Sequence, residues 1–297
     1  MIVDSHIHYW EPNTPERPWD PAGSNLGPAY LLEDLLRDAA EAGVDRVVDI
    51  TPSLMGNDNR YALEGARDER VAAVFARLDP RVERYDDELL ALAAHPAFAG
   101  LRFTIFGAAE QAWVDDGSLD RILALSESLG VATAFFYPRP RELARLIERH
   151  PGTPILIDHM AVDHRPTHRD PGYDAFTAWD DVPALAKLPN AYLKISNVAE
   201  LSRRGFPFDD VTPRLRAIYD AFGPDRLIWG SNYPPSKAVA TYAESVRYFH
   251  ELPFIPDADK AKIMGGTIAA LLDRVRARPG TAAYGAGSSP SRSSGSP

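Results

Sequence analysis

The stretch RLIWGSNYPP, residues 226–235, joins an apolar run to a polar segment that contains two prolines. A short run of bulky apolar residues closed by Gly-Ser is typical of a strand covered on both faces, as parallel strands are under crossover helices. Proline cannot donate to a sheet, so the strand is expected to end near Ser231. Asn232 then stands at its carboxyl end.

Seven similar apolar runs precede this one, at residues 2–8, 46–51, 71–76, 99–103, 131–137, 154–159 and 191–196. Amphipathic stretches separate many of them, at residues 31–43, 86–95, 120–130 and 141–150. Several of these stretches are followed by Gly or Pro, as helix ends commonly are. Eight alternating strand and helix units predict an α/β fold, a single-domain (β/α)8 TIM barrel. A doubly wound open sheet is the competing architecture.

The end of the chain differs in composition from the rest. Residues 255–279 have helical spacing and are expected to close the barrel, which would cover residues 1–278. The following segment is rich in Gly, Ser and Pro, and this composition predicts a disordered tail over residues 279–297.

Composition excludes several classes of protein. The net charge of -10 disfavours nucleic-acid binding, which needs clustered basic residues. The absence of cysteine removes thiol nucleophiles and thiolate metal sites. The first ten residues lack the pattern of a signal peptide, and no apolar run is long enough to span a membrane. We therefore expect a cytoplasmic protein that acts on a small molecule, with a homodimer as one further expectation.

Polar residues follow several of the predicted strands, at the edge where such barrels place their active sites. His6 and His8 end the first strand, His159 ends the sixth and Asn232 the eighth. Residues two apart on a strand share a face, so His6 and His8 can act as a pair, either as ligands or as buried imidazoles. The same alternation predicts that Asp158 points away from His159. Barrel closure makes the first and eighth strands neighbours, so both histidines should face Asn232.

Further candidates are expected to contact substrate. Arg102 ends the fourth strand, and its guanidinium suits a carboxylate, although a structural ion pair is the alternative. Trp10, Tyr137 and Tyr233 are expected to line the pocket, and Phe136 to pack in the core. The loops expected to shape the substrate site are residues 10–28, 52–60, 104–118 and 160–180. His164 and His168, in the last of these loops, either contact substrate or face solvent.

Several segments together resemble a known family. DSHIHYWEP (4–12), LARLIERHPGTPILIDHMA (143–161) and FGPDRLIWGSNYPPS (222–236) are similar to the amidohydrolase-related TIM-barrel hydrolases. The nearest branch contains sugar-acid lactonases and 2-pyrone-4,6-dicarboxylate lactonase, and the resemblance runs from about residue 2 to residue 275. It implies that His6, His8 and His159 polarise a lactone carbonyl or bind a metal. It also implies an Asp that activates water where this chain has Asn232.

This departure from the family pattern bears on the chemistry. A neutral amide can orient a water molecule, but it cannot take a proton from it at neutral pH. Either the three histidines hold one divalent metal, best Zn²⁺, or one of them acts as the base without any metal. FFYPRP, residues 135–140, offers no His, Lys or Glu to bridge two metals, so a binuclear site is not expected.

The leading hypothesis is a hydrolase of a small lactone or related cyclic ester, with histidines that polarise the carbonyl. Two alternatives stay open at this stage. One is a metal-dependent decarboxylase-type lyase of the same superfamily. The other is a catalytically altered barrel that acts as a binding protein.

Overall fold

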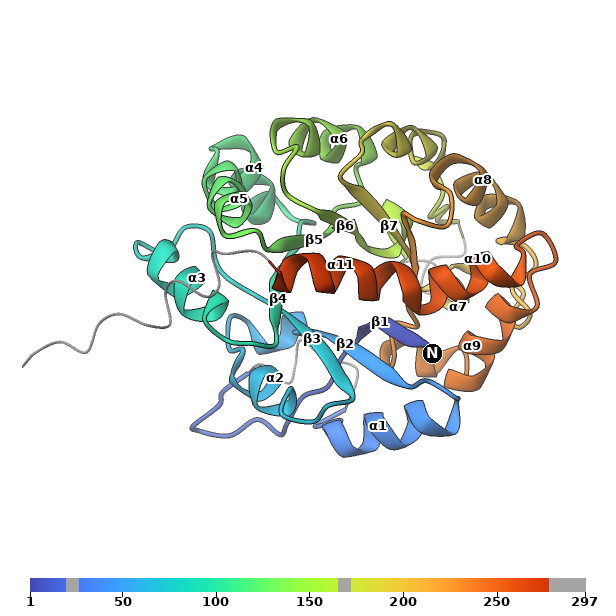
Figure 1. Ribbon diagram of the computed structural model, residues 1–297, viewed down its shortest axis with the longest axis horizontal. Coiled ribbons are helices and arrows are strands. Elements are labelled where there is room, and N and C mark those ends of the chain that lie inside the picture. Colours follow the sequence, from blue (N-terminus) through green and yellow to red (C-terminus); the bar gives the residue numbers. More distant parts are fainter. Residues whose placement is uncertain (20–26, 165–171, 278–297) are drawn as a thin grey trace, which may run out of the picture.

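The computed structural model describes residues 1–19, 27–164 and 172–277, and its centre is one sheet of eight parallel strands in the order β1 to β8 (Figure 1). The strands are β1 (Val3–Ile7), β2 (Arg46–Ile50), β3 (Val71–Ala76), β4 (Phe98–Thr104), β5 (Ala132–Phe136), β6 (Ile155–Ile157), β7 (Ala191–Ile195) and β8 (Leu227–Trp229). All eight predicted strands are present, and sequential parallel order confirms the barrel over the doubly wound alternative.

The sheet closes between its first and last strands. The backbone N–H of His8 donates to the carbonyl of Tyr233 at 2.9 Å, and that of Asn232 donates to the carbonyl of His6, also at 2.9 Å. Gly230 permits this approach, because a Cβ there would lie 2.9 Å from the Cβ of His6. Closure therefore joins the N-terminal histidines to the segment around Asn232.

Helices surround the strands as an outer ring (Figure 1). They are α1 (Leu32–Glu41), α2 (Arg60–Gly65), α3 (Tyr85–Ala93), α4 (Ala108–Asp115), α5 (Ser118–Leu129), α6 (Pro140–Arg149), α7 (Val198–Leu201), α8 (Thr212–Phe222), α9 (Tyr242–His250), α10 (Asp257–Ala261) and α11 (Thr267–Arg276). The four predicted amphipathic stretches correspond to α1, α3, α5 and α6. The predicted tail lies outside the described residues.

The last helix covers one end of the barrel. α11 runs across the sheet in Figure 1 and buries Ile268, Leu271 and Val275 against side chains of the barrel interior such as Val3 and Ala72. These partners lie at the amino ends of β1 and β3. The apolar face of α11 therefore seals the amino end, and the carboxyl end is left for a site.

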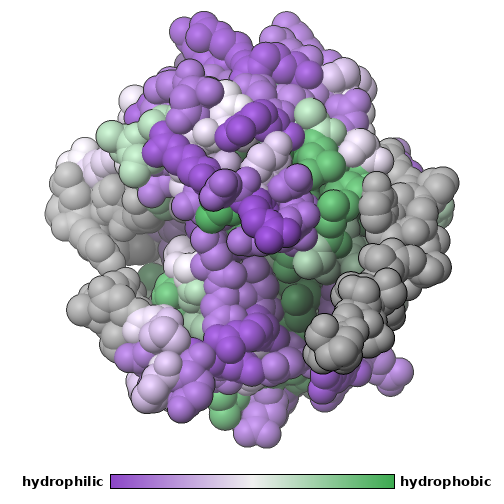
Figure 2. All heavy atoms as spheres, turned by 90° about the vertical axis from the view of Figure 1, so that its left-hand side faces the viewer, coloured by the Kyte–Doolittle hydropathy of each residue, from purple (hydrophilic) through white to green (hydrophobic). Residues whose placement is uncertain are grey.

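The outer surface is mainly hydrophilic. The face in Figure 2 shows hydrophilic side chains over most of its area, with smaller apolar areas between them. Met1, at 72% exposure, is the one large apolar side chain that is mostly exposed in the described part of the chain. No helix within the described ranges has the length and apolarity needed to cross a membrane.

Candidate active site

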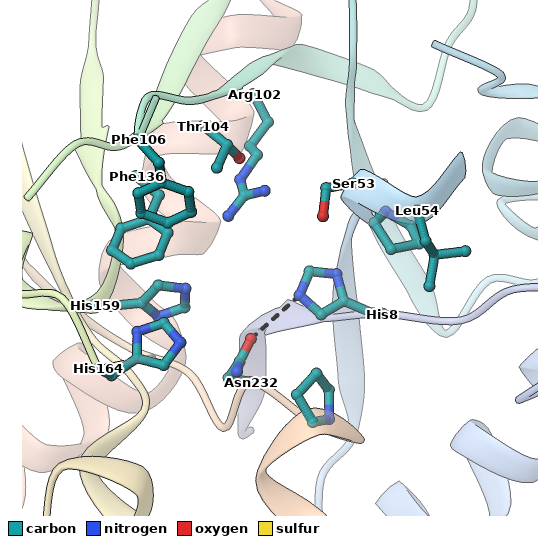
Figure 3. Close-up of a pocket in the computed structure, with 12 residues that line it drawn as sticks. His8, Ser53, Leu54, Arg102, Thr104, Phe106, Phe136, His159, His164 and Asn232 are labelled. Carbon is teal, nitrogen blue, oxygen red and sulfur yellow. Dashed lines mark hydrogen bonds between the residues drawn. The ribbon is translucent and has the colours of Figure 1, made fainter. Parts of the chain in front are cut away.

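A cavity of about 180 Å³ opens at the carboxyl ends of the strands (Figure 3). Its volume suits a small molecule of one ring. The lining residues lie at the ends of six of the eight strands or in the segments after them. They are His8, Pro52, Ser53, Leu54, Arg102, Thr104, Phe106, Phe136, His159, His164, Asn232 and Pro235. The predicted loops 52–60, 104–118 and 160–180 contribute to this lining, whereas the described part of 10–28 does not.

The two histidines of β1 lie at different depths. His8 lines the cavity, whereas His6 is fully buried, with ring centroids 5.0 Å from His8 and 4.5 Å from His159. The pairing of β1 with β2 shifts register between Asp4 and Ile7, as at a β-bulge. The bulge lets Val3 and His6 both face the barrel interior although they are three residues apart.

β6 ends in an unusual backbone that turns two neighbouring polar side chains inward. Leu156 faces the barrel interior, so alternation along the strand carries Asp158 inward as well. His159, at φ 52°, then begins a left-handed turn, and its ring also reaches the cavity. The prediction that Asp158 points away is therefore wrong. His159 Nδ1 lies 2.8 Å from the hydroxyl of Ser196, which fixes the ring.

Asn232 adopts the left-handed conformation, with φ of 59°. Asparagine is one of the few residues other than glycine that adopts this conformation readily. Its Oδ1 lies 3.2 Å from His8 Nε2 (dashed in Figure 3), and its Nδ2 donates to Asn197 Oδ1 at 2.5 Å. The amide is thus held through its Nδ2, and its Oδ1 lies at the cavity wall beside His8.

Below the cavity lies a buried charge cluster centred on Asp158. Its carboxylate pairs with Lys194 Nζ at 3.2 Å, with Arg102 Nε at 3.3 Å and with His6 Nδ1 at 3.3 Å. All four side chains are at least 94% buried. Burial alone would raise the pKa of Asp158, but Lys194, His6 and Arg102 hold it well below its usual value. Asp158 is therefore an anion held by the charges of Lys194 and Arg102, and burial lowers the pKa of both of these cations.

His6, His8 and His159 are neutral at neutral pH. Burial lowers the pKa of His8 to about 4, with a further contribution from the charge of Arg102. Burial also lowers the pKa of His6 and of His159 well below the usual value. At neutral pH these rings can accept hydrogen bonds, but they are weak bases.

Arg102 forms the structural ion pair that the sequence left as one alternative, and it also lines the cavity. Its Nε takes part in the ion pair with Asp158, and its guanidinium points into the cavity between His8 and His159 (Figure 3). The buried carboxylate fixes the direction of the guanidinium, so the terminal amino groups are presented to a ligand. Burial lowers the pKa of Arg102, but an arginine stays charged at neutral pH.

Three aromatic residues predicted to bind substrate are not among the residues that line the cavity. Trp10 packs with Trp19 and Met55, and the hydroxyl of Tyr137 donates to Glu142 and Gln111. The hydroxyl of Tyr233 donates to Asp38, outside the barrel, at 3.2 Å. Phe136, predicted to pack in the core, lines the cavity instead. Alternation along β5 explains why Phe136 lines the cavity and Tyr137 does not. Phe136 lies two residues after Ala134, which faces the barrel interior, whereas Tyr137 points outward.

Some residues of the site were missed in the sequence. Lys194 stands in the apolar run of β7, and a charge in such a run was a usable signal. Glu200 on α7 carried no such signal, because acidic residues are ordinary on short helices. For His164 the sequence left both substrate contact and solvent exposure open. His164 lines the cavity, where its ring stacks on Phe136 with a centroid distance of 5.1 Å.

The described side chains do not form a ready metal centre. No three His, Cys, Asp or Glu side chains of the described ranges converge so as to hold an ion. The charges also disfavour one, because Lys194 acts on His6, and Arg102 acts on both His8 and His159, to disfavour added positive charge. The imidazoles have the right chemistry for zinc, but their arrangement does not fit it, and we derive no step through a metal.

Comparison with known proteins gives the family. The family model described as amidohydrolase matches residues 3–274, nearly the whole barrel. The chain belongs to the amidohydrolase family. This amidohydrolase is 32% identical to L-fucono-1,5-lactonase of Burkholderia ambifaria over 256 residues, which are 82% of this chain and 83% of that protein. It is 26% identical to 4-sulfomuconolactone hydrolase of Hydrogenophaga intermedia over 78% of this chain and 74% of that one.

A solved structure agrees with the fold. An amidohydrolase of Burkholderia multivorans with bound zinc superposes with a TM-score of 0.78, at 24% identity, over 92% of this chain and 99% of that one. The relatives are hydrolases of cyclic esters by name, so the predicted hydrolase class and the predicted family branch are confirmed for this amidohydrolase.

Proposed function

We propose that this amidohydrolase hydrolyses a small lactone whose ring carries hydroxyl or carboxylate groups. The family and the lactonase relatives support the reaction class. The observation that carries the proposal is the guanidinium of Arg102, which is fixed by a buried carboxylate and directed into a one-ring cavity among neutral imidazoles.

The guanidinium supplies the electrophile for this reaction. Attack of water on the lactone carbonyl carbon pushes the π electrons onto the carbonyl oxygen, and this oxygen becomes negative. A fixed cation that already points at this oxygen stabilises the charge without reorganisation, an effect commonly worth about 10²–10³-fold in rate. The ring C–O bond then breaks, and the product is a hydroxy acid.

The neutral imidazoles suit an oxygen-rich ring. His8 Nδ1 lies 2.6 Å from the carbonyl of Ile50 and therefore carries the proton, so its Nε2 is an acceptor, as is Asn232 Oδ1 at 3.2 Å from it, and both lone pairs are left for a donor. An acceptor at the wall can take a hydrogen bond from a sugar hydroxyl. His159 Nδ1 lies 2.8 Å from the hydroxyl of Ser196, which can donate to this ring or accept from it. We therefore assign hydroxyl recognition to these rings and assign the polarisation of the carbonyl to Arg102.

The chemistry proposed above needs no metal, since Arg102 supplies the positive charge that zinc would supply elsewhere. One divalent ion per chain is the alternative, and elemental analysis distinguishes the two. A cytoplasmic location and a homodimer stay predictions from the sequence.

The test is an assay of acid release from a panel of five- and six-membered sugar lactones and carboxylated lactones, with CO₂ release from aromatic acids measured in parallel. We expect acid release without CO₂, and a loss of about 10²–10³-fold for Arg102→Met. The matched control is Arg70→Met, on a side chain that is 50% exposed. Turnover of the aromatic acids alone would identify a decarboxylase, and no turnover of either class would favour a binding protein.

A further inference from the structure

A second set of titratable side chains lies directly behind the cavity wall. His164 Nε2 is 3.5 Å from Glu200 Oε2, and the two side chains are 11% and 16% exposed. The imidazole belongs to the segment after β6 and the carboxyl to α7 after β7, so the fold brings together residues 36 positions apart. The mechanism above uses neither of them.

The pair reaches the site through His164. This ring lines the cavity, between the stacked ring of Phe136 and the edge of His159, whose centroid lies 4.9 Å away. Glu200 does not line the cavity and contacts the side chain of Asn232 on its other side. The carboxyl thus stands behind both an imidazole and the amide that occupies the position of the missing acid.

We propose that His164 is the base that deprotonates the attacking water, with Glu200 as the positioning residue that holds and charges the imidazole. This inference rests on the proposed lactone hydrolysis. It explains how Asn232 can stand where a carboxylate is expected. The carboxyl group is supplied by Glu200 on α7 and acts through His164, as a carboxylate acts behind the histidine base of a hydrolytic triad.

The steps balance without a further reactant. Water gives a proton to the His164 nitrogen that does not face Glu200, and the oxygen lone pair forms a bond to the lactone carbonyl carbon. The intermediate collapses, its ring C–O bond breaks, and the departing alkoxide takes the proton back from the imidazolium. The carboxylate of Glu200 stabilises that imidazolium, and the product is the hydroxy acid.

The pKa shifts of the neighbouring groups are consistent with His164 as the base and Glu200 as its positioning residue. Burial raises the pKa of Glu200 to about 7, and the hydrogen bond from Asn232 limits the rise. Within the described ranges, His159 contacts the His164 ring and His8 lies beyond Asn232, and both have lowered pKa values. Glu200 therefore becomes a carboxylate as the pH rises through about 7, and the charge that it offers to the His164 ring appears over the same range.

The experiment compares wild type with Glu200→Gln, which keeps the shape and removes the charge. We expect kcat to fall about 10²-fold or more with KM nearly unchanged, and the acid limb of the pH profile near pH 7 to be lost. The double variant with His164→Asn should be no slower than His164→Asn alone, because the two residues act as a unit. Glu251→Gln, half-exposed in an ion pair with Arg247, is the matched control and should match wild type.

A measurement without substrate separates this inference from the proposed function. The His164 ring is titrated by NMR in wild type and in Glu200→Gln, and we expect its protonation to move to lower pH in the variant. If wild type hydrolyses no lactone, the proposed function fails, while this titration still tests the pair. An unchanged titration, or a Glu200→Gln variant with wild-type kcat and pH profile, would overturn the inference.

Discussion

Replacement of Asp158 by Asn tests the charge cluster that fixes the guanidinium. The change is isosteric, but it leaves Arg102 and Lys194, both nearly or fully buried, without their carboxylate. Loss of one partner from a buried ion pair commonly costs 3–5 kcal/mol, because the remaining charge is left uncompensated. Here two cations remain, so we expect a loss of at least about 3 kcal/mol, on the order of 10 °C in Tm.

The assay is urea unfolding at pH 7, with the free energy of unfolding compared between variants. Asp225→Asn is the matched control, because the same chemical change there falls on a side chain that is 77% exposed. It should stay within about 0.5 kcal/mol of wild type. Lys194→Met should cost less than Asp158→Asn, since Arg102 still neutralises the carboxylate.

The pH dependence of the difference follows from the lowered pKa of Asp158. A carboxyl with a lowered pKa in the folded state contributes stability above its unfolded value, near 3.8, and loses it as the pH falls further. The gap between wild type and Asp158→Asn should therefore be constant from pH 7 to about pH 4 and shrink below that. A variant within 1 kcal/mol of wild type at pH 7 would refute this account of the cluster.

Three further results are expected. Asn232→Asp places a second carboxylate beside Glu200. The added negative charge should raise the pKa of Glu200 and move the acid limb of the pH profile for lactone hydrolysis to higher pH. An acid limb at the wild-type pH would contradict the contact between residues 232 and 200. Phe136→Leu should raise KM by about 10-fold, because the ring of Phe136 lines the cavity. Tyr137→Phe should leave KM unchanged, because the ring of Tyr137 faces α6. Equal effects of the two changes on KM in steady-state kinetics would contradict these two positions. Elemental analysis should find less than one metal ion per chain, and a chelator should not reduce activity; stoichiometric zinc that is lost together with activity would show that the imidazoles rearrange around an ion.

The strands were predictable because their burial on both faces selects continuous apolar runs. Each of the eight runs in the sequence became a strand, with ends within a few residues of those expected. The histidines were predictable for the same reason, since a polar residue that follows such a run lies at the mouth of the barrel. His8 and His159 line the cavity, and His6 lies just beneath them.

Side-chain direction was less predictable where the backbone departs from a regular strand. The left-handed turn that starts at His159 brings its ring inward together with Asp158, and no residue type in this segment announces such a turn. The direction of Phe136 depends on which residue of β5 is counted as inward, and the apolar run alone does not fix that choice. The apolar run therefore does not distinguish Phe136 from Tyr137 as the residue that lines the cavity.

Partnership across the fold was the least predictable property. His164 stands in the segment after β6 and Glu200 on α7, and each looks ordinary in its own segment. Their pairing depends on the path of the chain after β6 and after β7, which apolar spacing does not encode. Arg102 was recognised as a site residue because its position at the end of a strand does not depend on any loop.

Side chains fill the barrel interior and α11 covers its amino end, so within the described part of the chain the route to the site lies at the carboxyl ends of the strands. The lactone and the hydroxy acid made from it must use the same opening, so the product has to leave before the next substrate binds. Accumulated hydroxy acid should thus slow turnover by competing for entry. A linear polymer cannot pass through an interior that is filled with side chains, which restricts the proposed substrates to free rings or to a ring at a chain terminus.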